Sequence, residues 1–366
     1  MKQKLIPLTV ACLVSGAAFA QTNVQIYGTV DIGFAHRGDN VAKGVSSQNA
    51  INSGQADSSK IGFTGVEDLG NGLKALFVLE AGFLNDTGTH ADADGKLFNE
   101  QAFVGLTGGF GTAIAGRLIA PRYGFIAAID PFANGTVGQY TNVYNDVAFT
   151  NVDRVDNAVA YVSPSFGGFN VTLAYATNAI AQEGASTLGL PAQTDNDGDA
   201  KTIALLPRYT NGPLDVGVSY QRIKIKDAGG FGISPKITQW TVGGTYDFKV
   251  IKLGAYYDRA KANEDFVVSP VVDGKLTTWG LGVTVPFGKH AIQASYNRSR
   301  LDTNSDDGRA RQWALGYTYS LSKRTSAYAA YSDISNDTGR VADVGDAAND
   351  GNGYQNGLQL GLKHTF

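Results

Sequence analysis

Residues 24–34 read VQIYGTVDIGF, and the even-numbered positions of this stretch are apolar apart from one glycine. Successive side chains of a β-strand point to opposite faces of the sheet, so this spacing predicts a strand with one apolar and one polar face. The same period of two recurs along most of the chain, for example over 214–220, 279–287 and 313–321. The period therefore predicts an all-β protein.

Sixteen segments carry this pattern in a strong or weak form. They cover about 23–37, 57–67, 72–83, 98–107, 111–118, 153–163, 168–178, 201–210, 213–225, 236–248, 251–261, 275–287, 289–301, 310–321, 324–333 and 354–366. Short connections rich in Gly, Asn and Pro, as tight hairpins require, alternate with long polar ones. The long connections are 38–56, 84–97, 119–152, 179–200, 226–235, 262–274, 302–309 and 334–353. This alternation predicts an antiparallel up-and-down meander with all short turns at one end.

Composition excludes several classes of protein. The chain has 366 residues, 30 of them basic and 33 acidic, for a formal charge of −3. A nucleic-acid-binding protein needs a basic face, which this balance does not favour. The 46 glycines and 35 Tyr and Phe residues argue against a helical bundle and, with the many β-branched residues, against disorder.

The first 20 residues have the layout of a cleaved secretory signal. A basic start with Lys2 and Lys4 precedes an apolar stretch that ends at the small-residue pattern Ala18-Phe19-Ala20. We expect cleavage after Ala20, which removes Cys12, the one cysteine of the chain. Residues 21–366 are then expected to form a single β-barrel domain.

Alternation alone is compatible with a soluble sandwich or with a membrane barrel. The polar face is rich in small polar residues that suit a wet interior, and aromatic residues of the apolar face cluster beside the short turns, as in a membrane-interface girdle. These aromatic residues are Tyr161, Phe169, Tyr209, Phe248, Phe287, Tyr319 and Phe366. A spanning sheet cannot leave an open edge in lipid, so sixteen strands must close, and a barrel of about that size holds an aqueous channel.

Motifs along the whole mature chain resemble those of the trimeric general porins of Gram-negative bacteria, most closely the β-proteobacterial branch. They are VQIYGTVD (24–31), SKIGFTG (59–65), EDLGNGL (67–73), QAFVGL (101–106), YTNGPL (209–214) and GLKHTF (361–366). The resemblance implies passive diffusion of ions and small hydrophilic solutes, with no enzymatic turnover. It also implies a homotrimer in outer-membrane lipid and lipopolysaccharide, inserted by the barrel assembly machinery with Phe366 as the assembly signal.

In that family the third long loop, here 119–152, folds into the barrel and narrows it, and charges along the constriction set ion preference. The alternation of the strands predicts that several basic side chains point into the lumen and form a basic wall. Charged residues of the loop and one acidic residue of the wall are further candidates for the constriction. The basic-wall candidates are Arg37, Lys60, Lys74, Arg117 and Arg154, and the others are Arg122, Asp130 and Glu100, with Asp146 a weaker one. Arg122 replaces the acidic residue that usually follows the loop proline, and Glu100 stands where Arg is common. The preference for anions or cations therefore stays open.

Other interpretations rest on fewer residues. A sugar-specific channel would line its passage with aromatic rings, for which Tyr123, Phe125 and Phe132 are candidates. A surface adhesin or receptor would use the long loops for binding and the barrel as a scaffold. The four histidines are too widely separated for a zinc site, and we expect no cofactor. Residues 195–199 resemble part of a calcium loop but lack its later ligands, so weak cation binding there is a minor hypothesis.

Overall fold

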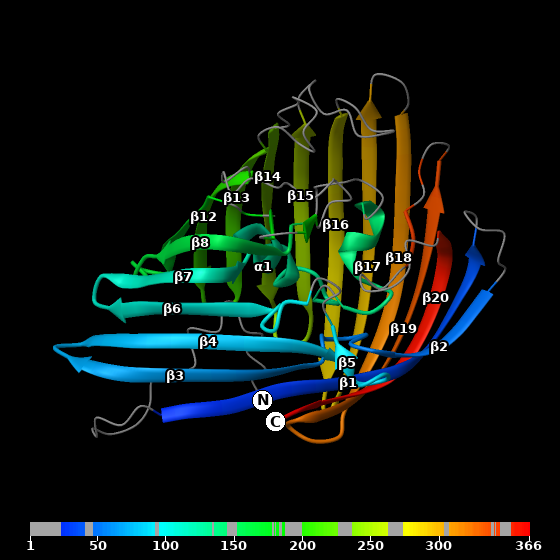
Figure 1. Ribbon diagram of the computed structural model, residues 1–366. Coiled ribbons are helices and arrows are strands. Elements are labelled where there is room, and N and C mark those ends of the chain that lie inside the picture. The colour runs from blue at the N-terminus through cyan, green and yellow to red at the C-terminus, as the bar shows by residue number, and fades with distance from the viewer. Residues whose placement is uncertain are drawn as a thin grey trace.

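The computed structural model shows one sheet that closes on itself as a barrel (Figure 1). It describes residues 23–40, 47–91, 95–133, 135–144, 152–177, 179, 181–182, 185–186, 200–225, 236–262, 274–303, 307–337, 340, 342–344 and 353–366. Within these residues the sheet has 18 strands, of which β5 is a two-residue bridge and β2 and β3 are two parts of one wall strand. Sixteen wall strands remain, as predicted, and all their pairings are antiparallel.

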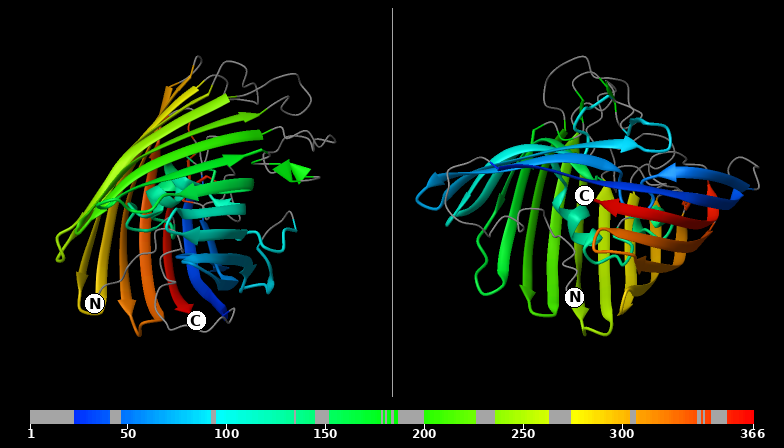
Figure 2. Two further views of the ribbon diagram at one scale, coloured as in Figure 1. Left: turned by 90° about the vertical axis from the view of Figure 1, so that its left-hand side faces the viewer. Right: turned by 90° about the horizontal axis from the view of Figure 1, so that it is seen from below.

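The elements follow one another along the chain as an up-and-down meander. They are β1 (Asn23–Asn40), β2 (Ser47–Ser53), β3 (Lys60–Gly70), β4 (Leu73–Leu84), β5 (Thr89–His90), β6 (Gln101–Gly108), β7 (Gly111–Ile119), α1 (Pro121–Ala127), the 3-10 helix η1 (Tyr140–Tyr144), β8 (Arg154–Val162), β9 (Phe169–Ala176), β10 (Ala181–Gln182), β11 (Ala185–Ser186), β12 (Ala200–Asn211), β13 (Leu214–Ile225), β14 (Lys236–Asp247), β15 (Lys252–Ala262), β16 (Gly274–Phe287), β17 (His290–Thr303), β18 (Asp307–Ser320), β19 (Thr325–Asn336) and β20 (Tyr354–Thr365). The strand ends that short turns join lie at one end of the barrel, called the short-turn end below, and the strand ends that precede and follow the long connections lie at the other, called the long-loop end (Figure 2).

The first and last strands close the barrel. One edge of β1 pairs with β20 from Thr29–Thr365 to Asn40–Tyr354. The other edge pairs with β3 near the short-turn end and with β2 near the long-loop end. The sequence pattern placed 47–53 in the first long loop, but this segment forms β2 because the long strand β1 offers it a free edge.

The wall has its apolar face outward. Ile26 and Leu362 are 62% and 46% exposed, whereas the side chains of Asp31, Gln312 and Gln359 are fully buried inside the barrel. A soluble protein shows the reverse arrangement, because water on its surface drives apolar side chains into the core. The exposed apolar face therefore matches a hydrocarbon environment, and the polar face encloses the lumen.

The third loop lies inside the ring of strands. Its described residues contain α1 and η1, which Figures 1 and 2 show within the curve of the barrel wall. Among the described residues no helix combines the length and the apolar character needed to cross a membrane. The inward course of this loop agrees with the expectation from the sequence.

Candidate functional site

The third loop begins where β7 ends and then follows the inner face of the wall. Pro121 is the first residue of α1, a position where a missing N–H costs no helical hydrogen bond. Beyond the helix, the backbone N–H of Val137 donates to Gln359 Oε1 over 2.7 Å, and Gln312 Nε2 donates to the Val137 carbonyl over 2.9 Å. Ser299 Oγ donates to the Val143 carbonyl. Buried polar side chains of β17, β18 and β20 therefore hold the loop by its backbone.

The third loop packs directly on glycines of the inner wall. A Cβ atom added to any of five glycines would come within 2.5–3.1 Å of a loop side chain, closer than nonbonded atoms approach. The pairs of glycine and loop residue are Gly217 and Phe125, Gly243 and Ile129, Gly282 and Pro131, Gly316 and Phe132, and Gly357 and Val137. Because these glycines belong to five strands between β13 and β20, the loop covers one long arc of the wall in direct contact.

Arg122 anchors the start of the loop to this arc. Its side chain is 1% exposed, and its Nε donates to Asp258 Oδ2 on β15 over 2.9 Å. The guanidinium also lies 5.8 Å from the centre of the Tyr144 ring. Burial disfavours the charged guanidinium, but the Asp258 carboxylate outweighs this effect and raises the pKa of Arg122 above its usual value. The sequence suggested a basic charge exposed on the loop, whereas the structure buries this one against the wall.

Asp130 braces the middle of the loop. It is 8% exposed, and its two carboxylate oxygens accept the backbone N–H groups of Phe132 and Tyr140, each over 3.1 Å. A carboxylate that accepts two backbone N–H groups fixes the shape of the segment between them. The structure thus places Asp130 in contact with its own loop, and Asp146 lies outside the described residues.

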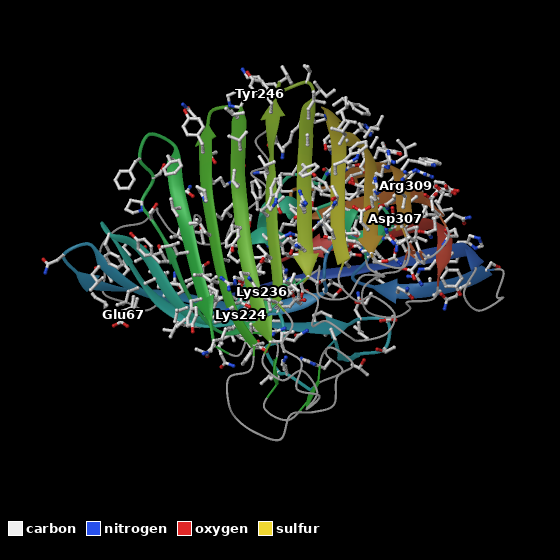
Figure 3. All side chains as sticks on the ribbon, turned by 90° about the horizontal axis from the view of Figure 1, so that it is seen from above. Glu67, Lys224, Lys236, Tyr246, Asp307 and Arg309 are labelled. Carbon is white, nitrogen blue, oxygen red and sulfur yellow. The ribbon has the colours of Figure 1, made fainter. Side chains whose placement is uncertain are left out.

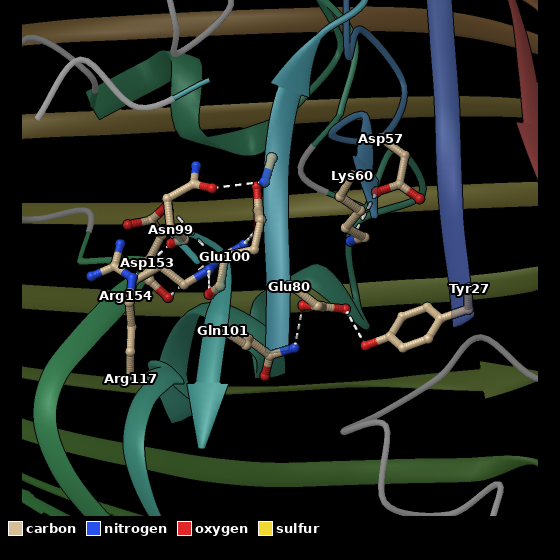
Figure 4. Close-up of polar contacts among 11 residues, drawn as sticks. Tyr27, Asp57, Lys60, Glu80, Asn99, Glu100, Gln101, Arg117, Asp153 and Arg154 are labelled. Carbon is tan, nitrogen blue, oxygen red and sulfur yellow. Dashed lines mark hydrogen bonds and ion pairs between the residues drawn. The ribbon is translucent and has the colours of Figure 1, made fainter. Parts of the chain in front are cut away.

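The wall that faces the loop carries a cluster of charged residues (Figure 4). Arg154, at the start of β8, donates through Nε to the Glu100 carbonyl over 2.9 Å and forms an ion pair with the Glu100 carboxylate. Its guanidinium lies 5.7 Å from the centre of the Tyr123 ring on the third loop. Lys60 Nζ lies 3.6 Å from Asp57 Oδ1. The structure therefore brings Lys60, Glu100 and Arg154 together on one side of the lumen, whereas the sequence assigned Glu100 to an acidic group separate from the basic wall.

Arg117 belongs to the same region. Its Nε donates to the Asn99 carbonyl over 2.6 Å, and its Nη1 forms an ion pair with Asp156. The second oxygen of Asp156 lies 3.2 Å from Lys96 Nζ. Asp156 and Lys96 were missed by sequence reasoning, although Asp156 lies two residues after Arg154 along the predicted strand.

The third loop contacts the facing wall at two places, near its start and in its middle. Tyr123 lies under Arg154, and the backbone N–H of Thr136 donates to the carbonyl of Gln55, two residues before Asp57. A second polar group, also missed, lies next to the cluster: Tyr27 Oη donates to Glu80 over 2.8 Å, and Gln101 donates to the same carboxylate over 2.6 Å. Figure 4 shows both groups on neighbouring strands.

The remaining candidates of the basic wall lie elsewhere. Lys74 is two residues beyond the β3–β4 turn and stands opposite Asp68 and Thr107, at the short-turn end of β4. Lys60 stands opposite Gly82, near the other end of that strand. Arg37 is 1% exposed and donates to Gln48 of β2 over 3.2 Å. Neither Lys74 nor Arg37 therefore joins the cluster around Arg154.

Two aromatic candidates for a sugar channel are buried. Phe125 is 1% exposed and Phe132 is 8% exposed, because each packs on a glycine of the wall. Only Tyr123 is partly exposed. Among the described residues no three His, Cys, Asp or Glu side chains come together as metal ligands, and 195–199 lies outside them.

Phe366 completes the seam of the barrel. Its backbone exchanges two hydrogen bonds with Gly28, of 3.1 and 3.2 Å, and its ring lies over that glycine on the outward face, 43% exposed. The terminal residue is thus part of the wall and remains accessible.

The chain is similar to known proteins over almost its whole length. A family model described as Gram-negative porin matches residues 8–339. An outer membrane porin protein of Bordetella pertussis is 30% identical over 400 residues, and outer membrane porin protein 32 of Delftia acidovorans is 30% identical over 377, each with 100% of both chains covered. A solved structure described as an anion-selective porin from Comamonas acidovorans has a TM-score of 0.77 and 28% identity, covering 94% of this chain and 100% of that one.

Proposed function

The chain belongs to the Gram-negative porin family, and we propose that it forms a weakly charge-selective passage between the third loop and the wall of Lys60, Glu100 and Arg154. The protein is an outer-membrane channel through which ions and small hydrophilic solutes diffuse passively, and it is not an enzyme. What remains to be proposed is which residues form its constriction and which ions it favours.

Pairing of opposite charges on the facing wall carries this proposal. Arg154 pairs with Glu100, Arg117 with Asp156, and Lys60 with Asp57. Each pair presents nearly no net charge to an ion a few ångströms away, because the fields of its two members cancel with distance. On the covered arc, the charge of Arg122 is cancelled in the same way by Asp258.

The relative from Comamonas is described as anion-selective, and a wall of unpaired cations would favour anions in this chain too. Here Glu100 and Asp156 offset two of the arginines that would supply such a field. We therefore expect a preference that is weak in either direction and that can be pushed in both directions by single substitutions.

Reversal potentials in a planar bilayer test this proposal. In a tenfold salt gradient a perfectly selective channel reaches about 59 mV, and we expect the parent protein to give a small fraction of this value. Glu100→Gln removes the nearer carboxylate partner of Arg154 and should shift the potential toward anions, whereas Arg154→Gln should shift it toward cations. Glu67→Gln, at the short-turn end of β3, is the control and should leave it unchanged (Figure 3).

These measurements distinguish an error in the proposed constriction residues from an error in the channel function itself. Stepwise conductance that rises in proportion to salt is expected of every variant. If Glu100→Gln and Arg154→Gln shift the potential in the same direction or not at all, the pair lies outside the constriction. A strongly selective parent would contradict the proposed neutralisation.

We further propose that the chain is exported by a signal cleaved after Ala20, is inserted by the barrel assembly machinery with Phe366 as the signal, and assembles as a homotrimer in contact with lipopolysaccharide. The family resemblance supports these proposals, as does the accessible terminal ring of Phe366. The molar mass of the purified protein, corrected for detergent, should equal three mature chains. Deletion of Phe366 should lower the yield of inserted protein without changing the conductance of the molecules that do insert.

A further inference from the structure

Asp31 of β1 is a buried carboxylate whose two oxygens are bound by groups from different parts of the barrel. Oδ1 accepts the hydroxyl of Tyr328 on β19 over 2.6 Å, and Oδ2 accepts the backbone N–H of Ala56 over 3.2 Å. Asp31 is fully buried, and a buried carboxylate requires such partners. Hydrogen bonds to a carboxylate are stronger than neutral ones, so Asp31 is a firm link between β19 and the connection from β2 to β3.

Tyr328 reaches Asp31 by crossing the strand that lies between them. The last strand, β20, pairs with β19 on one edge and with β1 on the other. The ring of Tyr328 lies over Gly361 of β20, where an added Cβ atom would overlap with the phenol. The glycine therefore leaves room for the tyrosine to pass over the seam at which the barrel closes.

Residues 54–59, called the β2–β3 segment below, pack on β1 around Asp31. The carbonyl of Asp31 accepts the N–H of Gly54 over 2.8 Å and the hydroxyl of Ser59 over 3.0 Å. Gln55 Nε2 donates to the Gly33 carbonyl over 2.8 Å. The backbone of Asp31 thus holds both ends of the segment, and its side chain holds the middle of the segment at Ala56.

The β2–β3 segment contacts the third loop next to the atom that Asp31 holds. The backbone N–H of Thr136 donates to the Gln55 carbonyl. Gly135 lies so close to the segment that an added Cβ atom would collide with the Ala56 carbonyl. The middle of the third loop therefore rests with its backbone directly on the backbone of the segment.

The same segment contacts the charged residues of the facing wall. Asp57 Oδ1 lies 3.6 Å from Lys60 Nζ, and Oδ2 lies 3.8 Å from Lys363 Nζ on β20. Figure 4 shows Asp57 and Lys60 beside the cluster around Arg154. Because Asp57 directly follows Ala56, a displacement of Ala56 would change the position of Asp57 relative to Lys60 as well as the contact with the third loop.

We propose that Asp31 is a positioning residue for diffusion through the channel. Its carboxylate keeps the β2–β3 segment on the wall and thereby fixes one side of the passage between the third loop and Lys60, so the inference rests on the passage proposed above. The loop is also held on the opposite arc by Gln312 and Gln359. Without the carboxylate, the segment is therefore the part that moves, and it should obstruct the passage intermittently.

Single-channel recordings of two variants test this role. Asp31→Asn removes the charge that strengthens both hydrogen bonds and places an amide group at one of the two oxygens. Loss of charge-assisted hydrogen bonds of this kind should raise the fraction of time spent at partly closed current levels about tenfold. Tyr328→Phe removes only one donor and keeps the bond to Ala56, so it should raise this fraction about threefold.

Tyr27→Phe is the matched control for Tyr328→Phe. Tyr27 lies over Gly62 and donates to Glu80 over 2.8 Å, so the variant also loses a tyrosine–carboxylate bond across a glycine, but outside the β2–β3 segment. Urea unfolding should show similar stability losses in both tyrosine variants, whereas only Tyr328→Phe should close more often. Equal closure in the two tyrosine variants, or parent-like closure in Asp31→Asn, would overturn the proposal.

A nitroxide spin label at Ser58→Cys reports on the segment itself. Ser58 is exposed, and Cys12, the one cysteine of the chain, lies in the expected signal. Label mobility in the electron paramagnetic resonance spectrum should rise with Asp31→Asn and stay at the parent level with Tyr27→Phe. Unchanged mobility in Asp31→Asn, or higher mobility without added closures, would contradict the role of Asp31. An error in the constriction residues would appear separately, as an unchanged reversal potential in Glu100→Gln.

Discussion

The arc of wall beneath the third loop and the wall that faces it are built from different residues. Under the loop, glycines such as Gly282 and Gly316 remove side chains so that the loop can lie on the backbone, and the charges of Arg122 and Asp258 are buried. On the facing wall, Arg154 and Glu100 stay at the lumen and are only 13% and 10% exposed because they pair. One wall therefore fixes where the loop lies, and the other carries the charges that we propose an ion meets in the passage.

The largest effect should come from breaking the buried pair on the covered arc. Arg122→Met leaves the Asp258 carboxylate buried without its cation and should cost about 3–5 kcal/mol in the free energy of unfolding. The double variant Arg122→Met/Asp258→Leu should recover most of this loss, because it leaves no uncompensated charge. Urea unfolding in micelles measures both. Equal stability of the single and double variants would show that the pair does not anchor the loop.

A smaller effect is expected from adding a side chain at one of the wall glycines on which the loop packs. Gly316→Val adds atoms where a Cβ already lies 2.6 Å from the Phe132 ring, so the loop must move away from the wall. Such overpacking costs about 1–3 kcal/mol, and the displaced loop should lower single-channel conductance. Gly109→Ala is the matched control, because a Cβ there meets no atom within 4 Å. An unchanged conductance in Gly316→Val would contradict the direct seating of the loop.

On the facing wall the expected change is in selectivity more than in stability. Asp156 is shared by Arg117 and Lys96, so Asp156→Asn should release two cations and move the reversal potential toward anions. The stability loss should stay within about 1 kcal/mol, since these groups remain partly hydrated. Asp153→Asn, on an exposed carboxylate 3.6 Å from Arg154, should give a smaller shift in the same direction. A larger shift from Asp153 than from Asp156 would reverse the order inferred from burial.

The smallest effect is expected at Lys74. This side chain lies at the short-turn end of β4, away from the cluster around Arg154, so Lys74→Gln should leave the reversal potential within the error of the parent value. Its stability should change by less than about 0.5 kcal/mol. A shift as large as that of Arg154→Gln would mean that the narrowest part of the passage lies nearer the short turns.

Strand phase predicted much of the barrel but little of the chemistry of the site. The segments around Val24, Leu214 and Trp313 alternate with a period of two because one face meets lipid and the other meets water, so their strands were predicted close to their observed bounds. The same phase placed Lys60 toward the lumen. It could not show that Asp57 lies next to Lys60, because the predicted strand 57–67 gives these two residues opposite phases, whereas the observed strand begins only at Lys60.

The candidate charges on the third loop show that the sequence pattern does not predict contacts between residues that are far apart in the chain. Arg122 and Asp130 were predicted as loop charges from their positions after Pro121 and in the middle of the loop. Their observed contacts, with Asp258 on β15 and with the backbone N–H of Tyr140, join residues 136 and 10 positions apart. The ring contacts of Trp240, Trp279 and Trp313 with tyrosines of the next strand were missed in a similar way, because they form only when the strands are placed side by side.

The sequence by itself determined the period of two, the alternation of short and long connections, and hence a closed sheet with a wet interior. These properties are local: each depends on what a side chain and its near neighbours meet, lipid or water. Only the tertiary structure decided which charges pair on the inner side of the wall and where the third loop lies. Those properties depend on distances between residues far apart in the chain, which are fixed only when strand register and closure bring them together.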